Sequence, residues 1–369
     1  MVKEKEFIPA LTGIRAISAY FIFFYHLNYF SPQNNSDAYL VLNQFYTFTT
    51  FFFVLSGLII CHKYYEISSL EWKTLYNYFV NRISRIFPIL FILISITFLL
   101  QYIKHLDTPD NILKSYFYNV SLLKGFSTEY KLTGIGPSWS MSVEELFYVL
   151  SPLIFSLTLK VSTLLKYVLL MYCVGALLTF IFSNLNADGF FGDYKFTYYF
   201  TFFGRAFEFA CGIFLALIIK GKLKPGLLGK AGKGSLYIGI ALVILSVSAL
   251  YFIARYYDLL HAQHTWAGLF VNNTILPIGI IFLFYGLIYH KSLLQRFLGS
   301  WVMVALGSAT YSFYLLHTTF VLSWIQKYIS HNLLVTFISM VLFSYCFYKL
   351  VEQPIARLLR KRLIIKQIN

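Results

Sequence analysis

The sequence predicts an all-α integral membrane protein, a bundle of about ten transmembrane helices with both termini in the cytoplasm. Hydrophobic residues fill 58% of the 369 positions and charged residues only 12%, whereas about a quarter of a soluble domain is charged. Mean hydropathy is +0.67, and the apolar residues gather in long runs. So little charge cannot cover a soluble globule, which disfavours a soluble enzyme, a nucleic-acid-binding protein and a disordered chain.

Ten apolar runs have the length of a spanning helix, which needs about 20 residues at roughly 1.5 Å each. They lie at about 11–30, 45–62, 86–103, 138–158, 164–183, 197–219, 235–254, 271–289, 301–326 and 333–350. The first run lacks the small-residue cleavage site of a signal peptide, so we expect it to remain as the first span. No internal repeat or linker divides the chain, which predicts a single transmembrane domain over 1–369 with a short basic cytoplasmic tail at about 351–369.

The distribution of positive charge predicts the orientation. The net charge is +15, from 30 Lys and Arg against 15 Asp and Glu, and 21 of the 30 cations fall in the inner segments when the N-terminus is placed inside. Only seven fall outside, namely Lys104, Lys114, Lys124, Lys131, Lys195, Arg255 and Lys327. This asymmetry is what the positive-inside rule predicts for a protein with both termini in the cytoplasm, and it explains the basic composition without nucleic acid.

The four cysteines lie in or beside the apolar runs and form no CxxC pair. No His/Cys spacing typical of a metal site is present either. We therefore expect neither a disulfide framework nor a bound metal.

Two ionisable residues in the first run are the strongest functional candidates, because a charge in a span is costly and is kept for a reason. Arg15 and His26 are eleven residues apart, close to three full turns, so both point the same way. We expect Arg15 near the cytoplasmic mouth and His26 deep on the same stripe, with Ala19 and Ile22 between them. The alternative is that Arg15 extends to the inner interface and His26 to the outer one.

Two further groups of charges lie at the third and fourth runs. Arg82 and Arg85 are three residues apart at the start of the third run; such a pair suits the phosphates of a polyanion, although alone it is as often a topological anchor. In WSMSVEELFY we expect Trp139 at an interface and at least one of Glu144 and Glu145 inside the membrane domain, with His26 or Arg205 as the natural partner.

The sixth and ninth runs carry the remaining candidates. Arg205 and Glu208 have the i, i+3 spacing of an internal ion pair, which is structural or catalytic with similar weight. His317 follows the small residues of the ninth run and is interpreted as an interfacial residue. Six other histidines fall in loops or at span edges and form no recognisable constellation: His62, His105, His261, His264, His290 and His331.

Taken in order, these segments resemble the acyltransferase type 3 family of integral membrane O-acyltransferases. The resemblance covers essentially the whole chain, and its most specific elements are Arg15 with ten residues before His26, and WSxxxEExFY. The matching segments are FFFVLSG at 51–57, RxxR at 82–85 followed by Pro88, WSMSVEELFYVLSP at 139–152, RAFEFACG at 205–212, GSATYSFYLLH at 307–317 and VEQP at 351–354.

The resemblance implies a multi-pass protein of the bacterial cytoplasmic (inner) membrane that takes an acyl group, usually acetyl, from cytoplasmic acyl-CoA. The acceptor would be a hydroxyl of an exported or lipid-linked glycan. Acetyl-CoA is the expected co-substrate, membrane lipid the surroundings, and no nucleic acid is expected. Some members carry an added outer hydrolase-like domain; we expect none after the tenth span, so the membrane domain would complete transfer.

Residue roles follow from this resemblance together with the chemistry of the side chains. We expect His26 as general base, Glu144 orienting it and Arg15 beside the path of the donor. Arg15, Arg82 and Arg85 would hold the phosphates of the donor. Substrate contact or structural support is expected from Trp139, Ser140, Glu145, Arg205, Glu208, Tyr311 and His317.

Two other function classes remain open at this point. A glycan exporter or flippase would also keep buried charges in ten spans, although the chain lacks two similar halves. A purely structural or sensory membrane protein would have to explain why so many costly charges are kept. The sequence does not distinguish direct transfer from a covalent acyl-His intermediate, nor identify the glycan, the acyl length or the oligomeric state.

Overall fold

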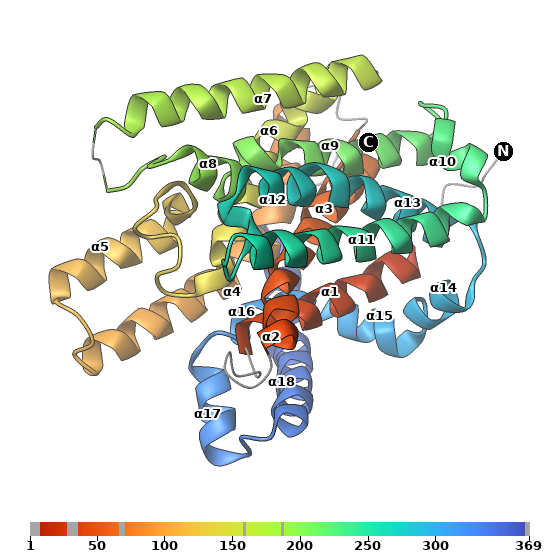
Figure 1. The fold of residues 1–369 in the computed structure, drawn as a ribbon. Coiled ribbons are helices and arrows are strands. Elements are labelled where there is room, and N and C mark those ends of the chain that lie inside the picture. Colours follow the sequence, from red (N-terminus) through yellow and green to blue (C-terminus); the bar gives the residue numbers. More distant parts are fainter. Residues whose placement is uncertain (1–7, 28–35, 66–70, 158–159, 186–187, 366–369) are drawn as a thin grey trace. The chain divides into compact units, whose positions relative to one another are not determined.

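The computed structural model describes residues 8–27, 36–65, 71–157, 160–185 and 188–365 (Figure 1). Within these ranges the chain is almost entirely helical, without a named strand. The one β-bridge joins Ser127 to Phe190. The all-α prediction is therefore confirmed.

The chain divides into two compact units. Unit 1 comprises the described residues of Met1–Tyr65, Thr158–Leu185 and Phe191–Ser308, and unit 2 those of Glu66–Leu157, Asn186–Phe190 and Ala309–Asn369. Each unit is described by itself.

Unit 1 holds fifteen of the described helical elements. They are α1 (Pro9–Leu27), α2 (Ser36–Asn43), η1 (Gln44–Phe48), α3 (Thr49–Tyr64), α7 (Val161–Phe182), α8 (Tyr194–Phe200), α9 (Phe202–Ile219), α10 (Gly226–Ala231), α11 (Gly234–Tyr256), η4 (Ala262–His264), α12 (Trp266–Phe270), the π-helical η5 (Val271–Ile275), α13 (Leu276–Tyr289), α14 (Leu293–Leu298) and α15 (Trp301–Ser308).

Glycines set the closest helix crossings in unit 1. A Cβ added to Gly212 of α9 would overlap the carbonyl oxygen of Val54 in α3, and one added to Gly57 of α3 would overlap that of Phe209 in α9. Helices inside a membrane gain little from burying apolar surface, so close backbone approach through small residues is a main source of their attraction. The α3/α9 pair is therefore a tightly packed crossing of unit 1.

Helices α11 and α13 lie side by side in unit 1 (Figure 1). Gly286, near the end of α13, packs against Leu236 near the start of α11, so the two helices run in opposite directions. At 23 residues, α11 is roughly 34 Å long, enough to cross a hydrocarbon layer of about 30 Å. Its two ends therefore define two opposite ends of unit 1.

Unit 2 holds the remaining elements. They are α4 (Trp72–Ile103), α5 (Pro109–Val120), η2 (Leu123–Phe126), η3 (Gly136–Ser138), α6 (Trp139–Ser156), α16 (Thr310–Leu316), α17 (Phe320–Tyr328), α18 (Leu333–Phe347), the π-helical η6 (Tyr348–Glu352) and α19 (Gln353–Leu363). Helix α19 follows α18 and η6 without interruption, so the tail predicted from about 351 continues a helix as far as Leu363.

The longest segment between predicted spans is an ordered part of unit 2 and contains a fully buried lysine. The Lys124 ammonium donates hydrogen bonds to the carbonyl oxygens of Thr133 (2.6 Å) and Ile135 (3.0 Å), to Asn119 Oδ1 and to Ser138 Oγ. Burial lowers the pKa of Lys124 to about 7, whereas the four oxygens favour its charged form. These contacts fasten the segment to the residue that precedes α6.

Eight helices of the described chain are long and apolar enough to cross a membrane, which agrees with a multi-pass protein. They are Pro9–Leu27, Asp37–Tyr64, Trp72–Ile103, Val161–Phe182, Tyr194–Ile219, Gly234–Tyr256, Trp266–Tyr289 and Leu333–Leu363. The predicted run 138–158 is the 18-residue helix α6. The number of crossings and the N-in/C-in orientation stay predictions.

The run predicted as one span over 301–326 is not one helix. It is divided into α15, α16 and α17. The second break lies at Thr319, whose backbone is extended and whose hydroxyl donates to the carbonyl of Leu316 (2.8 Å) and caps the Val321 amide at the start of α17. A threonine that offers the backbone such bonds competes with the helical ladder, and hydropathy alone does not register this.

Candidate functional site

Helix α1 carries the Arg15/His26 pair on one unbroken helix, as the sequence predicted. Arg15 is half-buried, and the residues between them on the stripe, Ala19 and Ile22, are 1% and 2% exposed. His26 lies in the last turn of α1 and is exposed. The imidazole is therefore accessible at this end of the described helix, and its depth in the membrane stays a prediction.

Aromatic rings gather at this end of α1. The Tyr25 ring lies 4.6 Å from that of His26 and 5.7 Å from that of His261, measured between centroids. Tyr46 of η1 is also 5.7 Å from His261. His261 comes from the loop after α11, so three segments of unit 1 meet beside His26.

The Arg205/Glu208 spacing forms the predicted internal ion pair. Arg205 Nη1 lies 2.6 Å from Glu208 Oε1, and the two residues are 1% and 0% exposed. Arg205 also donates to Asn273 Oδ1 (2.9 Å) and to the Tyr199 carbonyl (2.7 Å), and its guanidinium lies over the Tyr199 ring. Thr50 Oγ1 donates to Glu208 Oε1 at 3.2 Å. The partner of Arg205 is therefore Glu208, and the pair is embedded in a hydrogen-bonded network of unit 1.

The π-helical turn η5 supplies the amide of this network. Its Asn273 accepts from Arg205 and donates to the carbonyls of Tyr198 (2.7 Å) and Gly204 (3.1 Å). Asn272 donates to Asn273 Oδ1 at 2.7 Å. A π-turn places one extra residue in a helix and is frequent at functional sites, and here it directs two consecutive amides toward the ion pair.

Two predicted motifs of unit 2 meet at Tyr148. Its hydroxyl donates to Glu144 Oε2 at 2.8 Å, and the Arg82 guanidinium lies 5.8 Å from the centre of its ring. Arg82 is 8% and Glu144 9% exposed, while Arg85 and Glu145 are half-buried. The RxxR and WSxxxEExFY segments, far apart in the sequence, thus belong to one cluster.

The helix that carries the arginine pair begins earlier than the apolar run from which the third span was predicted, and the place of the pair at the membrane mouth stays a prediction. Helix α4 begins at Trp72, so Arg82 and Arg85 lie well inside it. Glu71, Trp72 and Lys73 are polar or amphipathic and exposed, which kept this first part of the helix out of the apolar run.

The start of α6 is joined to α16 within unit 2. Ser140 Oγ and Tyr314 Oη are 2.9 Å apart, and Tyr314 donates to the Pro137 carbonyl, also at 2.9 Å. Tyr311 donates to the Ile86 carbonyl of α4 at 2.6 Å. The predicted support residues Ser140 and Tyr311 therefore fasten three helices together.

Two predicted interfacial residues of unit 2 are buried. Trp139 is 7% exposed at the first position of α6, and His317 is 0% exposed at the end of α16. The His317 ring stacks on Phe313, and its Nδ1 lies 3.2 Å from the Phe313 carbonyl. Both side chains therefore pack inside the protein, and their place at a membrane interface stays a prediction.

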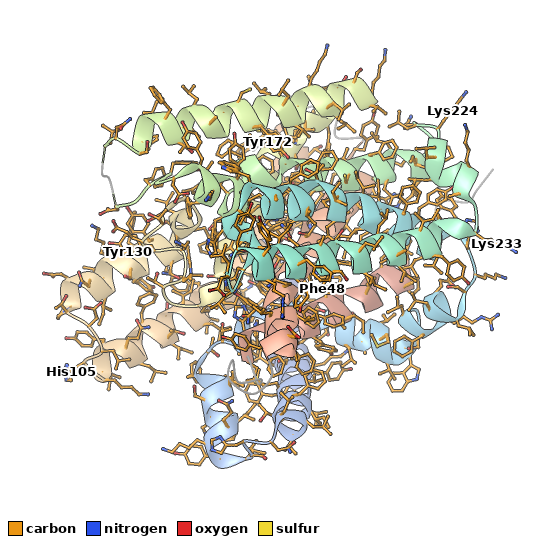
Figure 2. The ribbon with its side chains drawn as sticks, in the orientation of Figure 1. Phe48, His105, Tyr130, Tyr172, Lys224 and Lys233 are labelled. Carbon is orange, nitrogen blue, oxygen red and sulfur yellow. The ribbon has the colours of Figure 1, made fainter. Side chains whose placement is uncertain are left out.

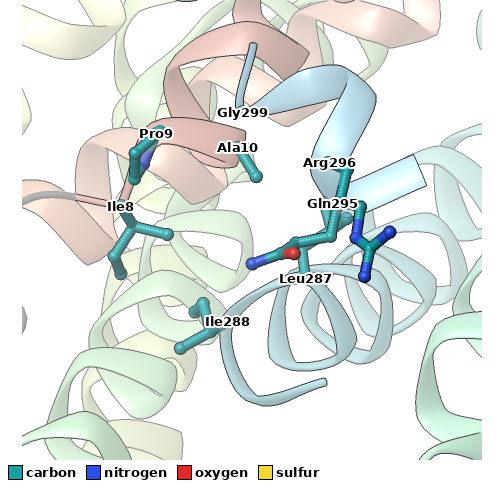
Figure 3. Close-up of a pocket in the computed structure, with 8 residues that line it drawn as sticks. All are labelled: Ile8, Pro9, Ala10, Leu287, Ile288, Gln295, Arg296 and Gly299. Atoms are coloured by element: carbon teal, nitrogen blue, oxygen red, sulfur yellow. The ribbon is translucent and has the colours of Figure 1, made fainter. Parts of the chain in front are cut away.

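A cavity of about 420 Å³ lies at the start of α1, at the opposite end of that helix from His26 (Figure 3). The Gln295 amide extends toward Ile8 and Ile288 in that view, and Arg296 is exposed. The complete lining is Ile8, Pro9, Ala10, Leu287, Ile288, Gln295, Arg296 and Gly299. The cavity therefore combines apolar walls with one amide and one cation.

Cations surround this end of unit 1. Lys224 lies just before α10 and Lys233 between α10 and α11 (Figure 2), and no Asp or Glu occurs between Glu208 and Asp258. The site is thus electrostatically suited to a polyanion. Among the described residues no three of His, Cys, Asp and Glu are grouped to hold a metal ion.

Sequence reasoning missed Tyr148, Asn273 and His261. Tyr148 lies four residues after Glu144, which places both on one helical face, so spacing alone could have suggested the contact. Asn273 and His261 meet their partners only through the tertiary fold, and no local pattern indicated them.

Comparison with known proteins shows which family the chain is similar to. The acyltransferase domain family matches residues 8–349. A protein of Staphylococcus aureus (strain COL) provisionally named an O-acetyltransferase is 23% identical over 383 residues, covering 95% of this chain and 58% of its own length. The O-acetyltransferase OatA of S. aureus (strain NCTC 8325 / PS 47) is 22% identical over 376 residues, with the same two coverages.

A third relative has a name that specifies its substrate. The peptidoglycan O-acetyltransferase OatA of Listeria monocytogenes is 24% identical over 174 residues, 42% of this chain and 25% of that protein. This chain spans under three fifths of the length of the first two relatives, and no solved structure matches it. Because the family match runs through both units and includes every segment that carried the resemblance except the last, VEQP, the chain belongs to the acyltransferase domain family, the acyltransferase type 3 family of membrane proteins.

Proposed function

We propose that this protein is a membrane O-acyltransferase that moves an acyl group, most simply acetyl, from cytoplasmic acyl-CoA to a hydroxyl of an exported or cell-surface glycan. The observation that carries the proposal is the family match over residues 8–349. The O-acetyltransferase names of the relatives support the acetyl group, and the Listeria relative supports a glycan acceptor.

In this proposal His26 is the general base. The acceptor oxygen attacks the thioester carbonyl, a new C–O bond forms and the C–S bond breaks. His26 takes the hydroxyl proton and returns it to the departing CoA thiolate, so atoms and charge balance. An imidazole ordinarily titrates near pH 6.5, and such proton transfer is typically worth about 10² to 10⁴ in rate. The exposed position of His26 in the last turn of α1 leaves it accessible to substrate.

The donor phosphates are assigned to arginines. Arg15 of unit 1 and Arg82 and Arg85 of unit 2 can each present two parallel N–H groups to a phosphate, a geometry that lysine lacks. The cationic end of unit 1 would raise the local concentration of the anionic donor. The cavity beside Arg296 offers apolar walls for a planar base and an amide for its polar edge, so it is the second place where the nucleotide of the donor could bind.

The proposal is tested with purified protein in lipid nanodiscs, supplied with acetyl-CoA and cell-wall glycan fragments. Wild type should release CoA and form an O-acetyl ester. His26→Ala should lose at least about 100-fold in rate, whereas His331→Ala, which also removes an exposed imidazole, should keep the wild-type rate. Full activity in folded His26→Ala would reject His26 as the general base. If wild type forms no ester, the proposed function is rejected.

Calorimetric titration of the same protein with acetyl-CoA tests each proposed donor contact separately. Arg15→Ala and the Arg82→Ala/Arg85→Ala double variant should each weaken binding, because each loses charge-assisted bonds to phosphate. Lys327→Ala removes one exposed cation that does not belong to the lysine-rich segment 220–233 and should not. Weakening by Arg296→Gln, with the other arginine variants unchanged, would place the nucleotide in the cavity instead.

A further inference from the structure

The loop between α11 and α12 is held in a fixed position over η1. Gln44, which is 0% exposed, donates from Nε2 to the Leu260 carbonyl at 2.8 Å and accepts at Oε1 from the Ala262 amide at 3.3 Å. The Gln263 amide donates to the Tyr46 hydroxyl at 3.2 Å. Three hydrogen bonds on four consecutive residues therefore fix the backbone on both sides of His261.

Two buried polar atoms of this loop lack hydrogen-bond partners within the described residues. They are Nε2 of His261 and Oε1 of Gln263, and Gln263 is only 8% exposed. A buried polar atom left without a partner costs roughly 1 to 3 kcal/mol, so proteins rarely keep one unless something else satisfies it. Two such atoms two residues apart, on a backbone fixed by three hydrogen bonds, indicate a binding site for an external polar group.

Aromatic faces complete the surroundings of His261. Tyr25 and Tyr46 each approach its ring edge-to-face, and Tyr25 also contacts His26. Burial lowers the pKa of His261 to about 4, with the neighbouring His264 contributing, so its imidazole is neutral at physiological pH. A neutral ring nitrogen, an amide oxygen and aromatic faces are the groups that bind the hydroxyls and the C–H face of a sugar ring.

We propose that Tyr25, Tyr46, His261 and Gln263 form the subsite that binds the sugar ring of the glycan acceptor. This inference rests on the proposed function and adds the substrate contacts on the acceptor side. His261 would bind a ring hydroxyl or N-acyl group and hold the acceptor beside His26, while His26 performs the proton transfer. His261 is therefore an acceptor-binding residue.

The subsite is tested by binding, independently of turnover. Protein in nanodiscs is mixed with the β-1,4-linked tetrasaccharide of N-acetylglucosamine, and saturation transfer from protein to sugar protons is measured by NMR. Wild type should show transfer. His261→Phe keeps an aromatic ring but removes both nitrogens, and we expect roughly tenfold weaker binding from the lost hydrogen bond. His264→Phe, three residues along the same loop and exposed, is the matched control and should bind like wild type.

Two further measurements keep the outcome unambiguous. Gln263→Leu should weaken the tetrasaccharide in the same way, which covers the case that His261→Phe does not fold, and the affinity of both variants for acetyl-CoA should be unchanged. Absent transfer with wild type, or equal transfer in wild type, His261→Phe and Gln263→Leu, would overturn the subsite. Tetrasaccharide binding that depends on His261, without any acetyl ester formed from acetyl-CoA, would retain the subsite and reject the proposed function.

Discussion

At the scale of single residues, this protein keeps its charges by pairing them inside apolar surroundings. Arg205 and Glu208 are almost completely buried, and the guanidinium also binds an amide and a backbone carbonyl. Such a pair gains little over apolar residues of the same volume, because removing two ions from water offsets their attraction. Losing one member alone is different, since it leaves a buried ion without compensation.

Arg205→Met should therefore destabilise unit 1 by about 3 to 5 kcal/mol, while the double variant Arg205→Met/Glu208→Leu should recover most of that loss. The free energy of unfolding in mild detergent, measured by denaturant titration of wild type and both variants, checks this expectation. Equal loss in the single and double variants would show that the network contributes through Asn273 and Tyr199 rather than through the charge pair.

The sequence identified the charged residues of the site better than their surroundings. Arg205 with Glu208 follows from helical spacing, and the Tyr148 contact of Glu144 could have followed from it as well. The contacts of His261 could not be predicted from helical spacing. Its neighbours Tyr25 and Tyr46 are more than 200 residues away in the chain, and only the fold brings them together. The exposure of the His26 side chain in the last described turn of α1 was likewise not indicated by the apolar run around it.

At the scale of helices, close crossings depend on glycines that hydropathy does not distinguish from other apolar positions. Gly212 of α9 lies directly against the backbone of α3. Gly212→Ala should separate the two helices at a cost of about 1 to 3 kcal/mol, as overpacking of a dense core does. The expected result is a lower unfolding temperature and a smaller folded fraction in detergent.

Gly234→Ala is the matched control for this crossing. Gly234 begins α11 and has open space where its Cβ would lie, so the change should be neutral or slightly stabilising, because alanine favours a helix over glycine by about 1 kcal/mol. If both variants melt at the same temperature, the α3/α9 crossing tolerates a side chain at position 212 and is not tightly packed there.

Eight of the ten predicted runs correspond to helices long and apolar enough to cross a membrane, and a ninth, 138–158, is the helix α6, because length and apolar composition are sufficient to recognise a buried or lipid-facing helix. The boundaries were less predictable. The run at 301–326 divides where Thr319 forms hydrogen bonds with the backbone. The first turns of α4 are polar, so the apolar run begins later than the helix does. Side-chain bonds to the backbone and amphipathic first turns are local features that an average over twenty residues removes.

At the scale of the whole molecule, the proposed function requires that donor and acceptor reach opposite sides of the membrane. Within unit 1 the cavity and the lysines of 220–233 lie at one end of α1 and α11, while His26 and His261 lie at the other. The positive-inside rule assigns the lysine-rich end to the cytoplasm. The His26 end would then face the exported glycan.

Cysteine labelling in intact cells checks this orientation. Cys173 and Cys346 are exposed and are first replaced by serine, after which single cysteines are placed at Lys233 and at Asp258, which flank the two ends of α11. A membrane-impermeant maleimide should label Asp258→Cys in intact cells and Lys233→Cys only after the membrane is opened. The reverse pattern would put His26 and His261 on the cytoplasmic side, and then neither residue could contact an exported glycan, whatever the activity of the protein.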